Sequence, residues 1–498
     1  MLNKLRLKVI SFLESKNDIP VLAAISAGLY PLLHYYNTNF SLINSWSHLV
    51  YFVAIYALLP ILIFVIVNKI FGRTKGLVKV KPYVLPVLNV SCFSLLLLMS
   101  TYGLELKFIV IVLLLAIVIG VLLKKHLKKI VVFQLLLSVL VFIKLVPDFY
   151  KHVTYSSEWV VQTDDIESVI FKKKPNVYII QPDGYANFSE LKGTNYNFDN
   201  TAFESFLREK DFKLYDGFRS NYNSTLSSNT SMFAMKHHYY NSPKRNANEL
   251  YNSRDLIVGE NPVTSIFKTN DYKTFLILEK PYLLVNRPKL AYDFCNIDYN
   301  EISYLARGFE IEKDVMSDLE QAIKYNTDSH NFYFIEKISP GHIAVNDIYS
   351  NGKEEERLSY LEELKSANTW LTQMITTIEA NDKNSLIVVI ADHGGFVGLD
   401  YTLQAREKQI EDDMVSTVFS SALAIKWPSA APEYDSKLKS NVNLFRILFT
   451  YLSENQNYLN ALEEDKSFSI IDRGAPFGVY EVIDDNDQVV FRKKADEN

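Results

Sequence analysis

The sequence has little cysteine, with only Cys92 and Cys295 among its 498 residues. Cys92 lies in an apolar segment and Cys295 in a polar part of the chain, so a disulfide between them is not expected. The chain also lacks a long basic tract with interleaved aromatic residues, which argues against a nucleic-acid partner. A net charge of −5 is typical of an ordinary soluble protein, but the hydrophobic residues are concentrated in the first third.

Charge is almost absent from five apolar stretches in that first third. The stretches are residues 19–36, 49–67, 84–99, 108–123 and 130–146. A membrane-spanning helix needs roughly 17–25 apolar residues, and the third and fourth stretches reach this length only with their flanks. One such stretch could be a buried helix of a soluble protein, but five in succession with short polar connections predict a membrane domain. Because others follow the first stretch directly, a cleaved signal peptide is the poorer interpretation.

Lysine and arginine are distributed unevenly among the connections. They are frequent in residues 4–16, 69–81 and 124–129, whereas residues 37–48 have none and 101–107 have only Lys107. Basic residues accumulate on the cytoplasmic side of a membrane. We therefore expect a cytoplasmic N-terminus, five crossings, and everything after the fifth on the outside. The expected location is the cytoplasmic (inner) membrane of a bacterium, with the remainder in the periplasm or outside the cell.

The remainder of the chain has the pattern of an α/β protein. Short apolar runs predict strands at residues 176–181, 274–278, 332–338, 386–391 and 422–427. Between them, helices are predicted at 200–210, 224–235, 355–380 and 440–452, and alternation at 477–494 predicts a terminal hairpin. We therefore expect a transmembrane domain at 1–150, a polar connector at 151–174, and an α/β domain with a mainly parallel central sheet at 175–498.

Polar side chains that suit catalysis follow two of the predicted strands. Asp392 and His393 come directly after the strand at 386–391, and Asp183 follows the first strand. Open α/β sheets bind ligands at this end of their strands. Taken alone, each of these two short sequences is more often a plain turn than a catalytic site.

Two further segments contribute candidate groups. A hydroxyl-rich segment at 220–232 runs into a predicted helix, whose N-terminus favours an alkoxide or a phosphate. His342 follows the strand at 332–338, where a lone histidine is more often structural. If Asp183, a hydroxyl of this segment, Asp392 and His393 converge, a divalent ion held there lowers the pKa of the hydroxyl and makes it a nucleophile. His342 is then free to protonate a leaving oxygen.

Five motifs together resemble the alkaline phosphatase superfamily. They are PNVYIIQPDGY, FRSNYNSTLSSNTSMF, ISPGH, IVVIADHGG, and the late pair ALAIKWP and NVNLFRIL, spread over residues 175–454. Their order and spacing are similar to the membrane-anchored sulfatase-like branch, which includes lipoteichoic acid synthases and phosphoethanolamine transferases. Five spans followed by an extracytoplasmic catalytic domain are also the layout of that branch.

The resemblance implies a role for individual residues. Asp183, Asp392 and His393 resemble metal ligands, Thr225 the metal-bound nucleophile, and His342 the histidine that contacts the substrate phosphate. Ser224 is the rival nucleophile. The resemblance implies one divalent metal ion, Zn²⁺ or Mn²⁺, while a complete second metal site is not evident.

The chain also departs from the family at two places. Relatives often have a histidine where this chain has Glu336, so the role of Glu336 is left open. They also often have a Pro-His pair where this chain has Pro340-Gly341-His342. The inserted Gly341 puts the placement of His342 in question.

The leading hypothesis is a membrane-bound transferase. It moves a phosphoglycerol- or phosphoethanolamine-type group from a lipid phosphate donor to an envelope glycan or lipid through a phospho-threonine. A phosphodiesterase or phosphatase of the same superfamily is the alternative, whereas a sulfatase is disfavoured because residues 222–229 lack a C/S-x-P-x-R sequence. The third hypothesis is a non-catalytic envelope protein. The presence of Thr225, Asp392 and His393 argues against it.

Overall fold

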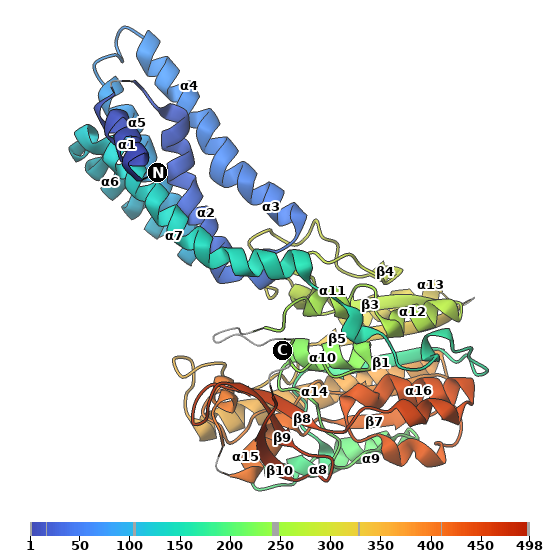
Figure 1. Cartoon of the computed structure of the whole chain (residues 1–498). Coiled ribbons are helices and arrows are strands. Elements are labelled where there is room, and N and C mark those ends of the chain that lie inside the picture. The colour runs from blue at the N-terminus through green and yellow to red at the C-terminus, as the bar shows by residue number, and fades with distance from the viewer. Residues whose placement is uncertain are drawn as a thin grey trace. The chain divides into compact units, whose positions relative to one another are not determined.

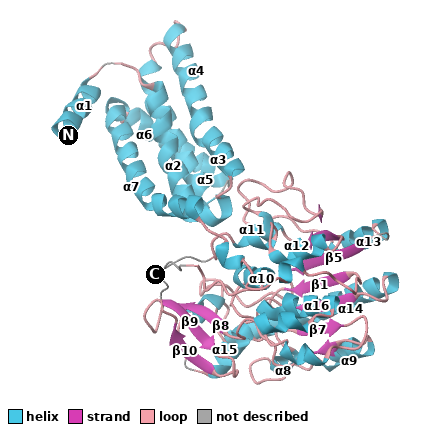
Figure 2. Cartoon of the chain, turned by 45° about the vertical axis from the view of Figure 1, so that its right-hand side comes forward, coloured by secondary structure: helices cyan, strands magenta, loops and turns pink. Residues whose placement is uncertain are grey.

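The computed structural model describes residues 2–15, 17–102, 106–241, 249–326, 329–409 and 411–495. Two places used in the prediction of membrane orientation, Lys16 and residues 103–105, lie outside the described residues. The chain divides into two compact units, Met1–Ser156 and Ser157–Asn498. All described strands belong to the second unit, and the first is built from helices (Figure 2).

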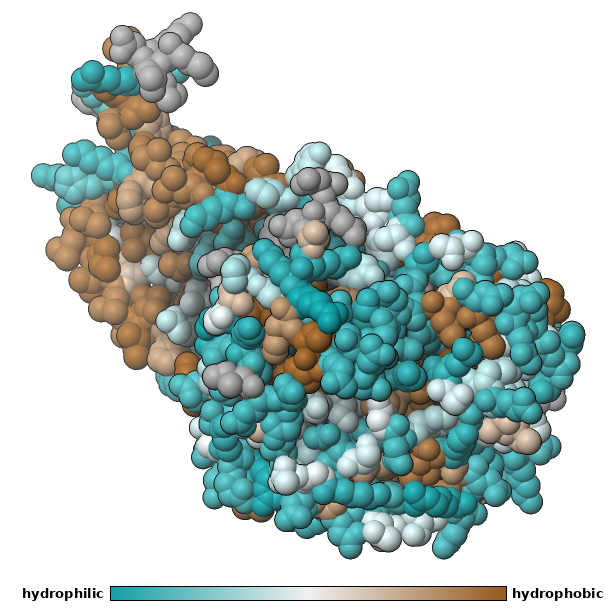
Figure 3. Space-filling model, turned by 60° about the horizontal axis from the view of Figure 1, so that its bottom comes forward, coloured by the Kyte–Doolittle hydropathy of each residue, from teal (hydrophilic) through white to brown (hydrophobic). Residues whose placement is uncertain are grey.

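The first unit contains the five predicted apolar stretches, each in a helix. Its elements are α1 (Leu2–Glu14), α2 (Pro20–Ile43), α3 (Trp46–Val53), the π-helix η1 (Ala54–Leu58), α4 (Leu59–Arg73), α5 (Lys81–Tyr102), α6 (Leu106–Leu122), the 3₁₀ turn η2 (Lys124–His126) and α7 (Leu127–Thr154). The second stretch forms α3, η1 and α4 as one continuous helix. Large apolar side chains cover much of this unit's surface, in contrast to the mostly hydrophilic surface of the second unit (Figure 3).

Three of these helical segments, among the described residues, are long and apolar enough to cross a membrane. They are Trp46–Arg73, Lys81–Tyr102 and Lys124–Thr154. α6 is apolar but has 17 residues, and at about 1.5 Å per residue it falls slightly short of a bilayer core about 30 Å thick. α2 has 24 residues but ends in the polar sequence NTNFSLI. The structure thus supports apolar membrane-type helices, while the count of five crossings stays a prediction.

Polar side chains inside the first unit pair with one another across helices. Ser26 of α2, Asn89 of α5 and Gln134 of α7 are all buried. The Asn89 amide donates to the Ala23 carbonyl at 2.7 Å and to Gln134 Oε1 at 3.0 Å, and the Ser26 hydroxyl donates to the same Oε1 at 2.9 Å. Such hydrogen bonds hold helices together where apolar surface provides no driving force.

The second unit is organised around a seven-stranded sheet of order β2-β7-β6-β1-β5-β3-β4. Its strands are β1 (Val177–Pro182), β2 (Lys213–Leu214), β3 (Tyr272–Leu278), β4 (Phe294–Cys295), β5 (His330–Lys337), β6 (Leu386–Ile390) and β7 (Leu423–Lys426). Strands β6, β1, β5, β3 and β4 run parallel. At one edge β7 pairs antiparallel with β6, and β2 pairs antiparallel with β7 and so runs in the direction of the other strands. The predicted mainly parallel sheet is present.

Helices cover both faces of this sheet, as an almost wholly apolar central strand requires. Tyr178 and Ile180 of β1 pack into one core, with α14 (Lys353–Asn381) and α13 (Val315–Tyr325). Val177 and Ile179 pack into the other. That second core includes residues of α10 (Thr225–Ala234), α11 (Ser253–Ile257), α12 (Pro262–Thr269) and α16 (Leu444–Ser453).

The remaining elements are short. The helices are α8 (Phe188–Leu191), α9 (Thr201–Glu209) and α15 (Asp412–Phe419), and the 3₁₀ turns are η3 (Glu158–Val160), η4 (Ile166–Ser168), η5 (Pro281–Leu284), η6 (Thr402–Arg406), η7 (Glu433–Lys437), η8 (Asn441–Asn443) and η9 (Gln456–Ala461). The predicted terminal hairpin is β9 (Gly478–Ile483) with β10 (Val489–Lys493). β8 (Ser467–Ile471) adds a third antiparallel strand to it (Figure 1).

Candidate active site

The candidate site lies where two neighbouring parallel strands end. β1 and β6 pair in parallel, with Ile180 opposite Val389. Asp183 directly follows β1, and Asp392 follows β6 after one residue. Because parallel strands end at the same edge of the sheet, the two carboxyl groups are brought together from positions 209 residues apart.

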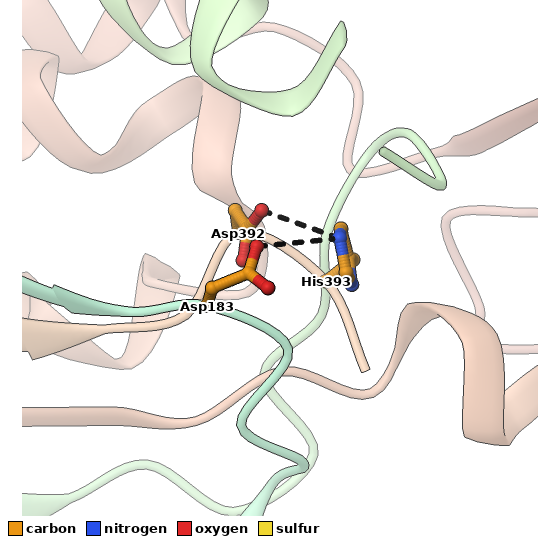
Figure 4. Close-up of side chains that lie close together, drawn as sticks. All are labelled: Asp183, Asp392 and His393. Carbon is orange, nitrogen blue, oxygen red and sulfur yellow. Dashed lines mark ion pairs between the residues drawn. The ribbon is translucent and has the colours of Figure 1, made fainter. Parts of the chain in front are cut away.

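Asp183, Asp392 and His393 form a compact cluster. Each offers one ligand atom, and these atoms all lie within 4.8 Å of one another. His393 Nε2 is 3.3 Å from Asp392 Oδ2 and 3.8 Å from Asp183 Oδ1. Figure 4 shows the ring facing both carboxyl groups. The sequence prediction that these three side chains converge therefore agrees with the geometry.

Thr225 joins the cluster through its hydroxyl group, which donates to Asp183 Oδ1 at 3.0 Å. It is the first residue of α10, so it lies at the positive end of that helix. Ser224 is the N-cap instead, and its Oγ accepts from the backbone N–H of Ser227. The two neighbouring hydroxyl groups thus have different partners, and only that of Thr225 is shown in contact with a residue of the cluster.

His342 reaches the site through a close approach of two backbones. The Gly341 N–H donates to the Asp183 carbonyl at 2.9 Å. A Cβ on Gly184, whose φ is +65°, would lie 2.1 Å from the Gly341 oxygen, so only glycine fits there. This contact places the His342 ring 5.9 Å from the His393 ring, measured between centroids. His342 is exposed, and it lies beside the cluster without being part of it.

The cluster is buried, so holding charged side chains there costs more free energy than it would in water. Asp183 is 4% and Asp392 0% exposed. Burial first, and then repulsion from Asp392, raise the pKa of Asp183 to about 7. Burial alone lowers the pKa of His393, but attraction to Asp392 and Asp183 outweighs it, so the net pKa is raised. Without a cation these two carboxylates repel each other in a poorly solvated place.

A divalent cation fits this set of donors. Asp392 Oδ1 accepts from the Gly184 N–H at 3.0 Å, whereas its Oδ2, although buried, has no hydrogen-bond partner among the described residues and has only the His393 ring near it, at 3.3 Å. His393 Nδ1 lies 2.9 Å from the Gly394 carbonyl oxygen. Since a carbonyl can only accept, Nδ1 carries the proton and Nε2 keeps a lone pair for a metal. Two carboxylates, an imidazole and a hydroxyl suit Zn²⁺ or Mn²⁺.

Two glycines fit the turn after His393 tightly against its surroundings. A Cβ on Gly394 would lie 2.2 Å from the Thr417 carbonyl oxygen, and one on Gly395 would lie 2.4 Å from the Tyr360 ring. The Tyr360 hydroxyl in turn donates to the Gly184 carbonyl at 2.9 Å and accepts from the Ala186 N–H at 3.0 Å. Tyr360 therefore braces both ligand-bearing turns at once. Nothing in the sequence marked it, because it is one aromatic residue within a long amphipathic helix.

Glu336, whose role the sequence left open, is a buried acid with no visible partner. It is 1% exposed, and neither carboxyl oxygen has a hydrogen-bond partner among the described residues. It lies opposite Gln181 of β1, two residues before Asp183. Burial first, and then Asp183, Asp392 and Glu279, raise the pKa of Glu336 well above its usual value.

No protein-family model matches this chain, and no curated protein does. Several solved structures are similar to it. The C-terminal periplasmic domain of EcEptC from Escherichia coli matches with 12% identity and a TM-score of 0.41, over 64% of this chain and 95% of that one. The lipoteichoic acid synthase LtaP from Listeria monocytogenes matches with 15% identity and a TM-score of 0.39, over 62% and 83%.

A membrane protein is also among the similar structures. The integral membrane lipooligosaccharide phosphoethanolamine transferase A from Neisseria meningitidis matches with 12% identity and a TM-score of 0.38, over 87% of this chain and 95% of that one. These structures include the kinds of enzyme that the sequence motifs resemble. At such identities and TM-scores the likeness adds no argument about chemistry, which depends on this chain's own residues.

Proposed function

We propose that this protein is a membrane-bound, metal-dependent phosphoryl-group transferase with Thr225 as its nucleophile. The observation that supports this best is the hydrogen bond of the Thr225 hydroxyl to Asp183, at the start of α10 and beside the buried Asp392 and His393. A threonine hydroxyl, a helix N-terminus and a buried cation site together serve one reaction type, attack on a phosphorus atom.

The reaction follows from the placement of these groups. A cation held by Asp183, Asp392 and His393 supplies positive charge that favours the ionised form of a neighbouring hydroxyl. The Thr225 oxygen forms a bond to phosphorus while the bond from phosphorus to the donor lipid's alcohol oxygen breaks. His342 takes up the proton that the Thr225 hydroxyl releases and donates it to that leaving oxygen. In the second half, an acceptor hydroxyl gives its proton to His342 and displaces Thr225, whose oxygen takes that proton back, which leaves the group on the acceptor.

The substrate class follows from the sequence motifs and the membrane-type helices. We propose a lipid donor of a phosphoglycerol or phosphoethanolamine group and an envelope glycan or lipid as acceptor. The proposed location is a bacterial cytoplasmic membrane, with five crossings and the second unit, Ser157–Asn498, on the outer side. A reporter that is active only outside the cytoplasm should work when fused after Lys174 and fail at Lys75. Equal activity at both points would contradict this topology.

The nucleophile is tested by trapping the covalent intermediate. Full-length protein in detergent, loaded with Zn²⁺ or Mn²⁺, is incubated with phosphatidylglycerol or phosphatidylethanolamine, quenched in acid and digested. Mass spectrometry should find the added phosphoglycerol or phosphoethanolamine mass on Thr225, and Thr225→Ala should abolish the adduct. Ser224→Ala should keep it. An adduct on Ser224 would overturn the assignment of the nucleophile but not the reaction type.

Hydrolysis is the second candidate, because His342 is exposed to water, which can take the place of an acceptor hydroxyl. The two reactions differ only in what resolves phospho-threonine. If the trapped adduct decays at the same rate with and without envelope glycan and releases the free head-group phosphate, the protein is a phosphodiesterase. Faster decay with the group on the glycan identifies a transferase.

A further inference from the structure

The second unit has one concentration of exposed apolar side chains, in the loop that follows His342. Nine large apolar side chains of this unit are exposed among its described residues, and three of them lie within five positions. Val345 is 48%, Ile348 87% and Tyr349 73% exposed. We call these three residues the apolar tip. Clustered apolar groups exposed to water, here three to seven residues after His342, indicate a partner surface.

The loop that carries the apolar tip is held in one conformation. The buried carboxylate of Glu356 accepts from the Ala344 N–H at 2.8 Å and from the Asn351 N–H at 3.0 Å, so one side chain fastens both ends of the loop. Within it, the Tyr349 N–H donates to the Asn346 carbonyl at 3.1 Å and closes a turn. The exposure of the apolar tip is therefore built into the fold.

A second set of hydrogen bonds fixes the same loop to η6 and the residues before it. The Thr402 N–H donates to the Ala344 carbonyl at 2.9 Å, and the Leu403 N–H to the Val345 carbonyl at 3.2 Å. The Ser350 hydroxyl donates to the Asp400 carbonyl at 2.5 Å. These bonds tie up backbone and polar groups at both ends of the loop and leave the tip's apolar side chains outward.

The chain itself indicates which partner covers the tip. The last candidate span ends at Thr154 and the second unit begins at Ser157, so the unit is tethered within a few residues of a bilayer. Two aliphatic residues beside a tyrosine are the composition that inserts at a membrane interface. Residues 343–350 contain one acid, Asp347, and no base, which fits zwitterionic rather than anionic lipid.

We propose that Val345, Ile348 and Tyr349 enter the interface of the phospholipid bilayer and hold the mouth of the candidate site beside the lipid head groups. The contact itself does not depend on the reaction. Its consequence for catalysis, delivery of a lipid donor to His342 and Thr225, rests on the proposed function.

Site-specific labels test the contact in the full-length protein. A cysteine-free background, Cys92→Ala with Cys295→Ala, receives Tyr349→Cys or, as the matched control, Tyr325→Cys. Tyr325 is a tyrosine of the same unit with 74% exposure, in α13 away from the loop. Each variant is labelled with nitrobenzoxadiazole and placed in phosphatidylcholine nanodiscs with or without 5-doxyl-phosphatidylcholine. The label at 349 should be strongly quenched by the doxyl lipid, and the label at 325 should not.

Each alternative gives a different outcome. Equal quenching at 349 and 325, or no quenching at 349, would overturn the proposal. Shielding of the 349 label from aqueous iodide without doxyl quenching would show that a second copy or another protein covers the tip, which also overturns it.

A kinetic experiment tests the consequence. The double variant Ile348→Ser, Tyr349→Ser changes only exposed side chains, so it should fold normally. Its KM for a long-chain lipid donor in nanodiscs should rise roughly tenfold, as expected when two apolar side chains no longer enter lipid. Cleavage of the water-soluble bis(4-nitrophenyl) phosphate should be unchanged. An unaltered KM for the lipid donor would refute the delivery role. If the unsubstituted protein does not turn over the lipid donor, the proposed function is contradicted. The membrane contact of the apolar tip is decided separately, by the quenching experiment.

Discussion

The α2–α5–α7 interface of the first unit and the strand ends of the second treat buried polar groups in opposite ways. In the first, buried polar side chains such as Asn89 and Gln134 satisfy one another across helices. In the second, buried polar groups at the strand ends are left incompletely satisfied, as Asp392 Oδ2 and both Glu336 oxygens show for the described residues. A satisfied network stabilises a fold, whereas unsatisfied acids cost stability and are ready to bind a cation. The contrast separates groups that serve structure from groups that serve chemistry.

The largest test of this contrast is the removal of one hydroxyl group at the site. Thr225→Ala should lower turnover of a lipid donor by at least roughly 10³-fold while leaving the fold intact, because the covalent step loses its nucleophile. Ser224→Ala removes only a helix cap and should cost about 1 kcal/mol of stability with far less effect on turnover. Steady-state kinetics and thermal unfolding measure both. Full activity of Thr225→Ala would end the transferase proposal.

A second test compares tight packing at the site with open packing in the first unit. Gly395→Ala places a methyl group against the Tyr360 ring and should destabilise the second unit by about 1–3 kcal/mol. Gly76→Ala, where nothing lies within 4 Å, should change stability by less than about 0.5 kcal/mol. Chemical denaturation followed by one probe in each unit provides the measurement. A neutral Gly395→Ala would show that the turn after His393 is not held as tightly as the contacts indicate.

Two buried histidines should each make the second unit less stable as the pH falls, opposite in sign to the effect of the buried acids Asp183 and Glu336. Burial lowers the pKa of His237 to about 4 and that of His238 to about 3, from an ordinary 6.5. The unfolded chain binds a proton at each histidine once the pH falls below the unfolded pKa of about 6.5, whereas the folded protein does not. The folded state is therefore at its most stable, as far as these histidines are concerned, above pH 6.5, and loses stability as the pH falls below it. Between pH 7 and 5.5 each histidine should therefore cost about 1 kcal/mol.

The comparison of variants shows whether these two histidines are the cause. His237→Gln and His238→Gln lower the starting stability, since His237 Nε2 bonds the Glu464 carbonyl and His238 Nε2 that of Ser227. In both variants, the unfolding free energy should nevertheless fall less between about pH 7 and 5.5 than in the unsubstituted protein, because one titrating histidine has been removed. An unchanged slope would assign the acid sensitivity to other groups.

The smallest expected effect is in the first unit. Asn89→Ala removes the donors to the Ala23 carbonyl and to Gln134, and should cost about 0.6–1.7 kcal/mol, the range found for such bonds between membrane helices. Unfolding of the first unit in lipid micelles should show this loss, while metal binding by the second unit should be unchanged. A change in metal affinity would show that the two units are coupled.

Local sequence was sufficient for the elements that carry the site. The apolar runs of β1 and β6 predicted buried strands, since only a sheet covered on both faces tolerates such continuous hydrophobicity. The motifs then placed Asp183, Asp392 and His393 at the strand ends, and the structure brings them together. The positions of basic residues predicted an orientation in the membrane, but whether α2 and α6 cross it depends on helix length and flanking polarity, which the apolar stretches alone did not decide.

Only the tertiary structure decided the contacts between segments that are far apart in the chain. The sequence motif favoured Thr225 over its rival Ser224, and only the structure shows the contact that distinguishes them, the hydrogen bond from Thr225 to Asp183, 42 residues away. The bracing by Tyr360 and the fastening of the apolar tip by Glu356 were equally hidden, because an aromatic residue and a glutamate on a long helix are ordinary in composition. Residue type and periodicity describe a segment's own conformation, whereas a hydrogen bond between distant segments exists only once the sheet has set their positions.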